Sequence, residues 1–143
     1  MGCKLIAANM KNRCASYLVS LFDQETMALA ALIDGNRITG IRTAGTAAIA
    51  VDAIAPRRPL RVAVIGSGFE ANGLFSALAA VRTIDSACVY SPTPASRERF
   101  AAAFREQLGI HIQAADTAES AVNGADVVLC AARSRDETPV LLG

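Results

Sequence analysis

The chain lacks an excess of charge of either sign. Its 143 residues include 14 Lys and Arg against 13 Asp and Glu, which gives a formal net charge of +1. Proteins that bind nucleic acid or an anionic membrane surface carry a basic run or stripe, and this sequence has neither. We therefore expect no nucleic-acid partner and no membrane partner, while small neutral or anionic ligands stay open.

Metal-binding and disulfide patterns are missing as well. Cys3, Cys14, Cys88 and Cys130 are widely spaced without a C-x-x-C pair, and the single histidine, His111, has no companion. This spacing predicts no metal site. It is typical of reduced, mostly buried thiols in a cytoplasmic protein.

No apolar run is long enough to cross a membrane. The most apolar stretch, residues 44–55, is too short and contains Asp52. The N-terminus has Ile6 where myristoylation needs Ser or Thr, and it shows no signal-peptide profile. With 52% hydrophobic residues and a mean hydropathy of +0.34, we expect a soluble protein with a substantial core.

The second part of the sequence, after the connector Pro56-Arg-Arg-Pro59, alternates strands with helices. The expected strands are residues 60–65, 87–90, 110–113 and 126–130, and the expected helices are residues 70–82, 95–108 and 117–122. Strands that are apolar throughout and alternate with helices predict an α/β fold, a Rossmann-type parallel sheet with helices on both faces.

The first part is less regular. Strands are expected at residues 4–8, 16–22 and 27–33, followed by a helix at residues 39–54. We predict that residues 1–55 form part of a mixed α/β domain that ends in this helix. Residues 56–143 are predicted to form a nucleotide-binding domain that is incomplete at its C-terminus, because a complete dinucleotide fold usually carries six strands.

A glycine turn follows the first strand of the second part. Gly66-Ser-Gly68-Phe-Glu-Ala71 fits the pattern G-x-G-x-x-G/A between an expected strand and an expected helix, which is the context that a dinucleotide site requires. Such a turn brings a diphosphate close to backbone N–H groups at the positive end of a helix. The alternative is a tight turn without a ligand.

The ends of the other strands complete the expected ligand edge. Parallel strands bring their carboxyl ends to one edge, so Ser91, Thr93, Ala131 and Ala132 are expected beside the glycine turn. Asp116, Glu119 and Asp126, which flank the third helix, show no metal-ligand spacing and are assigned no chemistry.

The residues after the second strand indicate which dinucleotide is bound. The acid that binds the ribose of NAD belongs at the end of that strand, but the sequence there reads Tyr90-Ser-Pro-Thr93, and Asp85 comes before the strand. Hydroxyl groups followed by Arg97 and Arg99, without a carboxylate, favour the 2′-phosphate of NADP over NAD. The alternative is that both arginines lie on a solvated helix face.

Two cations in the first part are candidates for binding an anion. Arg42, with Thr39 and Thr43, lies in the first turns of the expected helix, where a guanidinium can hold a carboxylate by two parallel hydrogen bonds. Lys4 is a charge within an apolar strand. A surface arginine and an edge lysine are the structural alternatives.

Together these segments resemble the ornithine cyclodeaminase/mu-crystallin family, over almost the whole chain. The matching segments are Cys3-Lys4-Leu5, Ile38-Thr-Gly-Ile-Arg42-Thr43-Ala44, Ile65-Gly-Ser-Gly-Phe-Glu-Ala71, Val89-Tyr-Ser-Pro-Thr93 and Gly124-Ala-Asp126.

The resemblance implies a role for each candidate residue. Lys4 and Arg42 match family residues that clamp the carboxylate of the substrate. The matching cofactor residues are Thr43, Gly66, Ser67, Gly68, Phe69 and Glu70 near the phosphates, and Ser91, Thr93 and Arg97 near the adenosine ribose. The resemblance also implies that residues 1–55 are part of a substrate and dimerisation domain and that residues 56–143 form the NAD(P)-binding domain.

The implied activity is NAD(P)-dependent conversion of ornithine to proline and ammonia, through hydride transfer and an imine, in a cytoplasmic homodimer. The alternatives are a cyclic imine reductase or alanine dehydrogenase on the same scaffold, and a non-catalytic NADP-binding protein of the crystallin type. The family's catalytic acid lies beyond the position of Gly143, so we expect no catalytic residue within the chain. We expect the chain to be the central portion of a longer enzyme.

Overall fold

A computed structural model describes residues 1–9, 11–12 and 14–132. The chain divides into two compact units, Met1–Arg42 and Thr43–Gly143. The border falls inside helix α1 (Asn36–Ile54), whereas the sequence places the domain border at the connector after residue 55.

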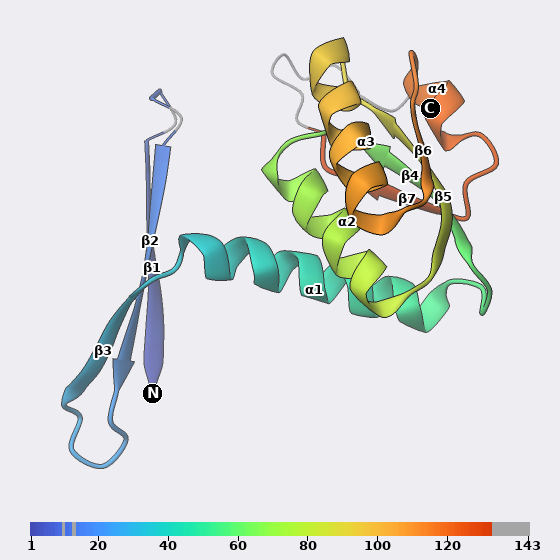
Figure 1. Ribbon diagram of the computed structural model, residues 1–143. Helices are drawn as coiled ribbons and strands as arrows, with labels where there is room; N and C mark the ends of the chain where they lie inside the picture. The colour runs from blue at the N-terminus through green and yellow to red at the C-terminus, as the bar shows by residue number, and fades with distance from the viewer. Residues whose placement is uncertain (10, 13, 133–143) are drawn as a thin grey trace. The chain divides into compact units, whose positions relative to one another are not determined.

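The first unit is an antiparallel sheet followed by the start of α1 (Figure 1). Its strands are β1 (Gly2–Asn9), β2 (Cys14–Phe22) and β3 (Leu29–Asp34), in the order β1-β2-β3. Helix α1 begins three residues before the predicted start at Thr39. The carbonyl of Gly35 accepts hydrogen bonds from the Thr39 backbone N–H and from its hydroxyl, at 2.9 and 2.7 Å, and these bonds close the first helical turn.

The second unit confirms the predicted fold class. Strands β4 (Leu60–Ile65), β5 (Ile84–Tyr90), β6 (His111–Ala114) and β7 (Val127–Cys130) form a parallel sheet in the order β6-β5-β4-β7. Helices α2 (Phe69–Val81), α3 (Pro94–Leu108) and α4 (Ala118–Val122) connect them. Strand β5 starts three residues earlier than predicted, so the placement of Asp85 before the strand is wrong: it lies inside the strand, at the amino end.

The core on one face of this sheet is built around three phenylalanines. The ring centroid of Phe75 in α2 lies 5.6 Å from that of Phe100 and 4.9 Å from that of Phe104, both in α3. These rings pack with buried strand residues such as Val62 and Val89. On the other face, Ala121 of α4 packs with Ile65. Helices therefore cover both faces, as predicted.

Most of α1 belongs to the second unit. Ala44 and Ala48 are buried, and Val51 and Ala55 pack against the phenylalanine core. An ideal Cβ on Gly73 of α2 would lie 3.6 Å from the Cβ of Ala44, so small residues allow the two helices to approach closely. Because residues 44–55 pack on the core of the second unit, that unit begins at Thr43 and not at the connector after residue 55.

The expectation of mostly buried cysteines is wrong. Cys3, Cys14 and Cys130 are exposed, Cys88 is half-buried, and all four are free thiols. Two of the exposed thiols lie in the antiparallel sheet of the first unit, where β1 is exposed along its whole length. No helix within the described residues is long and apolar enough to span a membrane.

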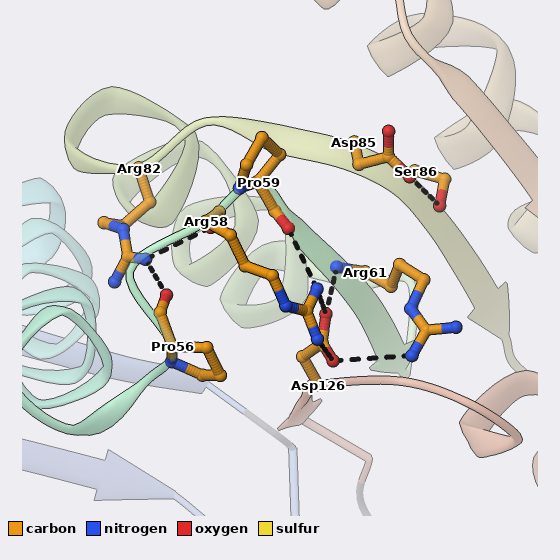
Figure 2. Close-up of polar contacts among 8 residues, drawn as sticks. All are labelled: Pro56, Arg58, Pro59, Arg61, Arg82, Asp85, Ser86 and Asp126. Atoms are coloured by element: carbon orange, nitrogen blue, oxygen red, sulfur yellow. Dashed lines mark hydrogen bonds and ion pairs between the residues drawn. The ribbon is translucent and has the colours of Figure 1, made fainter.

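An ion-pair network ties the connector to the amino ends of β4 and β7 (Figure 2). The carboxylate of Asp126 accepts hydrogen bonds from Arg58 Nη1 and Nη2, at 2.9 and 2.6 Å, and from the Arg61 backbone N–H at 2.9 Å. Arg82 donates to the carbonyl oxygens of Pro56 and Arg58. The hydrogen bonds from Arg58 and Arg61 hold the pKa of Asp126 well below its usual range.

Asp126→Asn is expected to lower the Tm of the second unit by several degrees at pH 7. A carboxyl group whose pKa is depressed by folding stabilises the native state above its ordinary pKa of about 3.9, and this contribution is lost as the pH falls below that value. The difference in Tm between the variant and the unmutated chain should therefore shrink below about pH 4, as measured by circular dichroism.

Glu106→Gln is the control, because Glu106 is an exposed carboxylate of the second unit, on α3, and is not part of the Asp126 network. It should leave the Tm nearly unchanged. Equal effects of the two substitutions would show that general charge, and not the Asp126 network, is responsible.

Candidate functional site

The carboxyl ends of the four parallel strands meet at one edge, as predicted. The Gly66 N–H, directly after β4, donates to the carbonyl of Tyr90 at the end of β5, at 2.7 Å. The Ala131 N–H, directly after β7, donates to the carbonyl of Ile65 at 2.8 Å. The glycine turn is thereby held between the ends of its two neighbouring strands.

Gly66 is required by its backbone conformation and by its neighbour. Its φ is +109°, a value that side chains rarely allow, and an ideal Cβ would lie only 2.8 Å from the carbonyl oxygen of Ala131. Because the close atoms are backbone, they have little freedom to move aside. This glycine therefore lets the turn pass directly beside the end of β7.

Gly68 has the opposite surroundings. It is the N-cap residue of α2, with no side-chain hydrogen bond to cap the helix, and an ideal Cβ there meets nothing within 4 Å. The first N–H groups of a helix have no intrahelical acceptor and form its positive end. Open space in front of such an end fits the diphosphate of a dinucleotide.

Two further groups shape the turn. The Asn72 side chain donates to the carbonyls of Gly68 and Ser67, at 2.7 and 3.3 Å, and ties these acceptors to the helix. The Ser67 hydroxyl donates to the Ser91 hydroxyl at 2.9 Å, and Ser91 is buried. Sequence reasoning missed Asn72, although its position four residues after Gly68 is the spacing at which one helical turn brings a side chain back.

Helix α2 packs closely under the turn. Ala71, the third small position of the glycine pattern, is fully buried in the core. Phe69 and Glu70, at the first two positions of α2, are exposed. Their predicted contacts with a cofactor stay predictions, as do those of Thr93, the exposed N-cap residue of α3, and of the half-buried Ala131 and Ala132.

Arg97 is fixed against the end of β5 and does not lie on a solvated helix face. Its Nη1 donates to the carbonyl of Ser91 at 3.2 Å, and its guanidinium carbon lies 6.0 Å from the ring centroid of Tyr90. Its Nη2 lies 2.5 Å from the carboxylate of Asp116, which follows β6. Arg99, by contrast, is exposed.

The predicted substrate residues Lys4 and Arg42 both lie in the first unit. Lys4 is exposed in β1, with its Nζ 5.0 Å from the ring centroid of Tyr17 on β2. Arg42 is exposed in α1, and the earlier start of the helix places it beyond the first turn, where the effect of the helix dipole has weakened. Their binding of a carboxylate stays a prediction, as does the cofactor role of Thr43.

Burial raises the pKa of the Cys88 thiol, which keeps it protonated. Among the residues that the structure describes, no group of three His, Cys, Asp or Glu side chains is placed to hold a metal ion.

A parallel sheet whose first strand enters a glycine turn at an open helix N-terminus is the arrangement typical of dinucleotide-binding α/β proteins. Within that class, the model of the ornithine cyclodeaminase/mu-crystallin family matches residues 1–143, and the chain belongs to this family.

Three relatives illustrate the range of the family. The NAD(P)H-dependent anabolic L-arginine dehydrogenase of Pseudomonas aeruginosa is 37% identical over 105 residues, which are 73% of this chain and 32% of that protein. The Thermococcus litoralis Δ1-pyrroline-2-carboxylate reductase, solved with NADH and L-proline, superposes with a TM-score of 0.81 at 27% identity, over 90% of this chain and 42% of that one. A lysine cyclodeaminase superposes with a TM-score of 0.79 at 31% identity, over 99% of this chain and 42% of that one.

The chain thus spans about two fifths of the length of these solved relatives. The names of these relatives describe an NAD(P)H-dependent dehydrogenase, a reductase solved with NADH and L-proline, and a cyclodeaminase that recognises L-lysine, L-ornithine and L-2,4-diaminobutyric acid.

Proposed function

We propose that the protein is an NAD(P)-dependent enzyme that transfers hydride at the α-carbon of a small amino acid, with the cyclisation of ornithine to proline and ammonia as its reaction. The observation that carries the proposal is the glycine turn: Gly66 fits closely between two strand ends, while Gly68 leaves space at the N-terminus of α2. Family membership supports the choice of substrate class.

The residues at the sheet edge fit a nicotinamide dinucleotide, which supplies reversible hydride transfer when bound. The N–H groups at the start of α2 would receive its diphosphate, because Gly68 places no side chain in front of them. Ser91, Thr93 and Arg97 would hold the adenosine ribose. The nearby guanidinium of Arg97 supports NADP as the preferred form, since arginine binds phosphate strongly.

Lys4 and Arg42 are proposed to hold the substrate carboxylate. Two cations would fix the orientation of the α-carbon, and such positioning lowers the barrier to hydride transfer. The support is their match to the family's substrate-binding positions, together with the exposure of both side chains.

Reduction of a cyclic imine is the second candidate, supported by the resemblance to the Δ1-pyrroline-2-carboxylate reductase. Two assays on the whole protein separate the candidates. Release of ammonia from ornithine with catalytic amounts of NAD(P)⁺ would support cyclodeamination. Oxidation of NAD(P)H by Δ1-pyrroline-2-carboxylate, without release of ammonia, would support reduction. Cofactor binding with neither activity would contradict both and favour a crystallin-type binding protein.

Arg42→Gln is expected to raise the KM for the amino acid about 100-fold, because a charge-assisted bidentate contact would be lost. The Kd of the cofactor should stay within about twofold, as loss of one substrate contact leaves the dinucleotide site intact. Steady-state kinetics and calorimetry measure the two quantities. Arg37→Gln removes an exposed arginine from the first turn of the same helix and serves as the control. Equal KM values for the two variants would contradict the role of Arg42.

We further infer that the whole protein is a cytoplasmic homodimer. The first unit supports assembly because its sheet exposes large apolar side chains, among them Leu5, Ile6 and Leu32. The four free thiols support a reducing compartment. Sedimentation velocity on the whole protein tests the dimer, and a monomer at micromolar concentration would contradict it.

A further inference from the structure

Asp116 occupies a position at the cofactor edge that its sequence pattern did not reveal. It lies just after β6, where Ala115 is held by a hydrogen bond of 2.8 Å from its N–H to the carbonyl of Val89. Strand β6 is the neighbour of β5 in the sheet. The Asp116 carboxylate therefore lies beside the end of β5, whose residues are expected to determine the preference for NAD or NADP.

The Asp116 carboxylate lies 2.5 Å from Nη2 of Arg97. The two partners differ sharply in exposure: the Arg97 side chain is 11% exposed and the Asp116 side chain 93%. Arg97 is held at the same time by the Ser91 carbonyl and lies near the Tyr90 ring. The guanidinium is thus already positioned, while the carboxylate faces solvent at the same place.

This pairing changes what Arg97 offers to a ligand. A guanidinium has five N–H donors, so contacts with Ser91 and Asp116 do not use all of them. A 2′-phosphate that approaches Arg97 would, however, also approach a carboxylate of like charge. The 2′-hydroxyl of NAD meets no such repulsion, and it can donate a hydrogen bond to an acid at this end of the site.

We propose that Asp116 sets the cofactor preference of this protein: its carboxylate pairs with Arg97 and opposes a 2′-phosphate, which keeps NAD(H) in competition with NADP(H). The inference rests on the proposed dinucleotide site and adds a specificity residue to it. The sequence pattern alone favours NADP, because no carboxylate lies at the end of β5. The structure brings one to that place from the residues after the neighbouring strand β6.

The test compares the Kd values of NADPH and NADH by fluorescence titration of the whole protein at low salt. Asp116→Asn is expected to tighten NADPH binding roughly fivefold and to leave NADH unchanged or slightly weaker, since a single exposed charge contributes modestly. The gain for NADPH should decrease at 0.5 M salt, because salt screens exposed charges.

Two further variants separate this role from a structural one. Arg97→Met should weaken NADPH binding. When Asp116→Asn is added to Arg97→Met, the affinity for NADPH should increase less than it does in the unmutated chain, because the partner of Asp116 is absent. Glu119→Gln removes another exposed carboxylate, in the first turn of α4, and should leave the NADPH to NADH ratio within about twofold.

The outcomes distinguish the inference from the proposed function. An unchanged ratio in Asp116→Asn, or weaker NADPH binding because Arg97 is no longer held, would overturn the role of Asp116 while leaving the dinucleotide site in place. Failure of the unmutated protein to bind either dinucleotide would overturn the proposed function itself.

Discussion

Gly68→Val is expected to abolish dinucleotide binding while the protein keeps its fold. An ideal Cβ at Gly68 meets nothing within 4 Å, and its φ of −87° is accessible to any residue, so valine fits the protein alone. Its branched side chain would fill the space in front of the first N–H groups of α2. A diphosphate needs that space, so we expect the affinity for NADPH to fall about 100-fold or more.

Calorimetric titration with NADPH measures the loss, and thermal unfolding tests the fold. Gly68→Ala is the graded control, since a single methyl group fills less of the same space and should weaken binding by a smaller factor. Unchanged affinity in Gly68→Val would show that the turn does not bind the diphosphate. A large drop in Tm would instead show that the open space is needed for folding.

The fold of the second unit was predictable because its signals are local. Residues 60–65 are apolar throughout and run into glycines, which fixes a buried strand and the turn after it. Phe100 and Phe104 are four residues apart, a spacing that places both on one face of a helix, and both are buried in α3. Each of these features depends on a few neighbouring residues. They can therefore be predicted without knowing which strands pair or how the helices pack.

The contacts across strands were not predictable in this way. The pairing of Arg97 with Asp116 joins residues 19 apart, and it depends on the strand order β6-β5, which a single sequence does not encode locally. The prediction that Cys3 and Cys14 are buried is wrong for a related reason. Composition indicates that cysteine is usually buried, but the sheet that carries these two thiols has little packed against it within the first unit.

The candidate substrate residues show a different limit. Lys4 is a charge among apolar residues in the sequence, and the structure places it on an exposed strand. Its role and that of Arg42 come from the resemblance to the family, because neither pattern alone distinguishes a binding cation from a surface one. The KM of Arg42→Gln therefore tests a role that rests on that resemblance alone.

Gly66→Ala is expected to destabilise the second unit by about 2–4 kcal/mol, through backbone strain and a steric clash. At a φ of +109° a side chain is strained, and its Cβ would lie 2.8 Å from the Ala131 carbonyl oxygen. Relief of the clash would separate the ends of β4 and β7. Urea unfolding at pH 7 measures the change in the free energy of unfolding.

Gly109→Ala separates the two causes. Gly109 ends α3 with a φ of +65°, but an ideal Cβ there meets nothing within 4 Å. Its substitution should cost about 1–2 kcal/mol, the strain of a left-handed conformation alone. The additional loss of stability in Gly66→Ala then measures the steric clash with Ala131. Equal losses in the two variants would show that the end of β7 moves aside at no cost in free energy. Because strand separation would also move the turn, Gly66→Ala should lose both stability and cofactor binding, whereas Gly68→Val should lose binding alone.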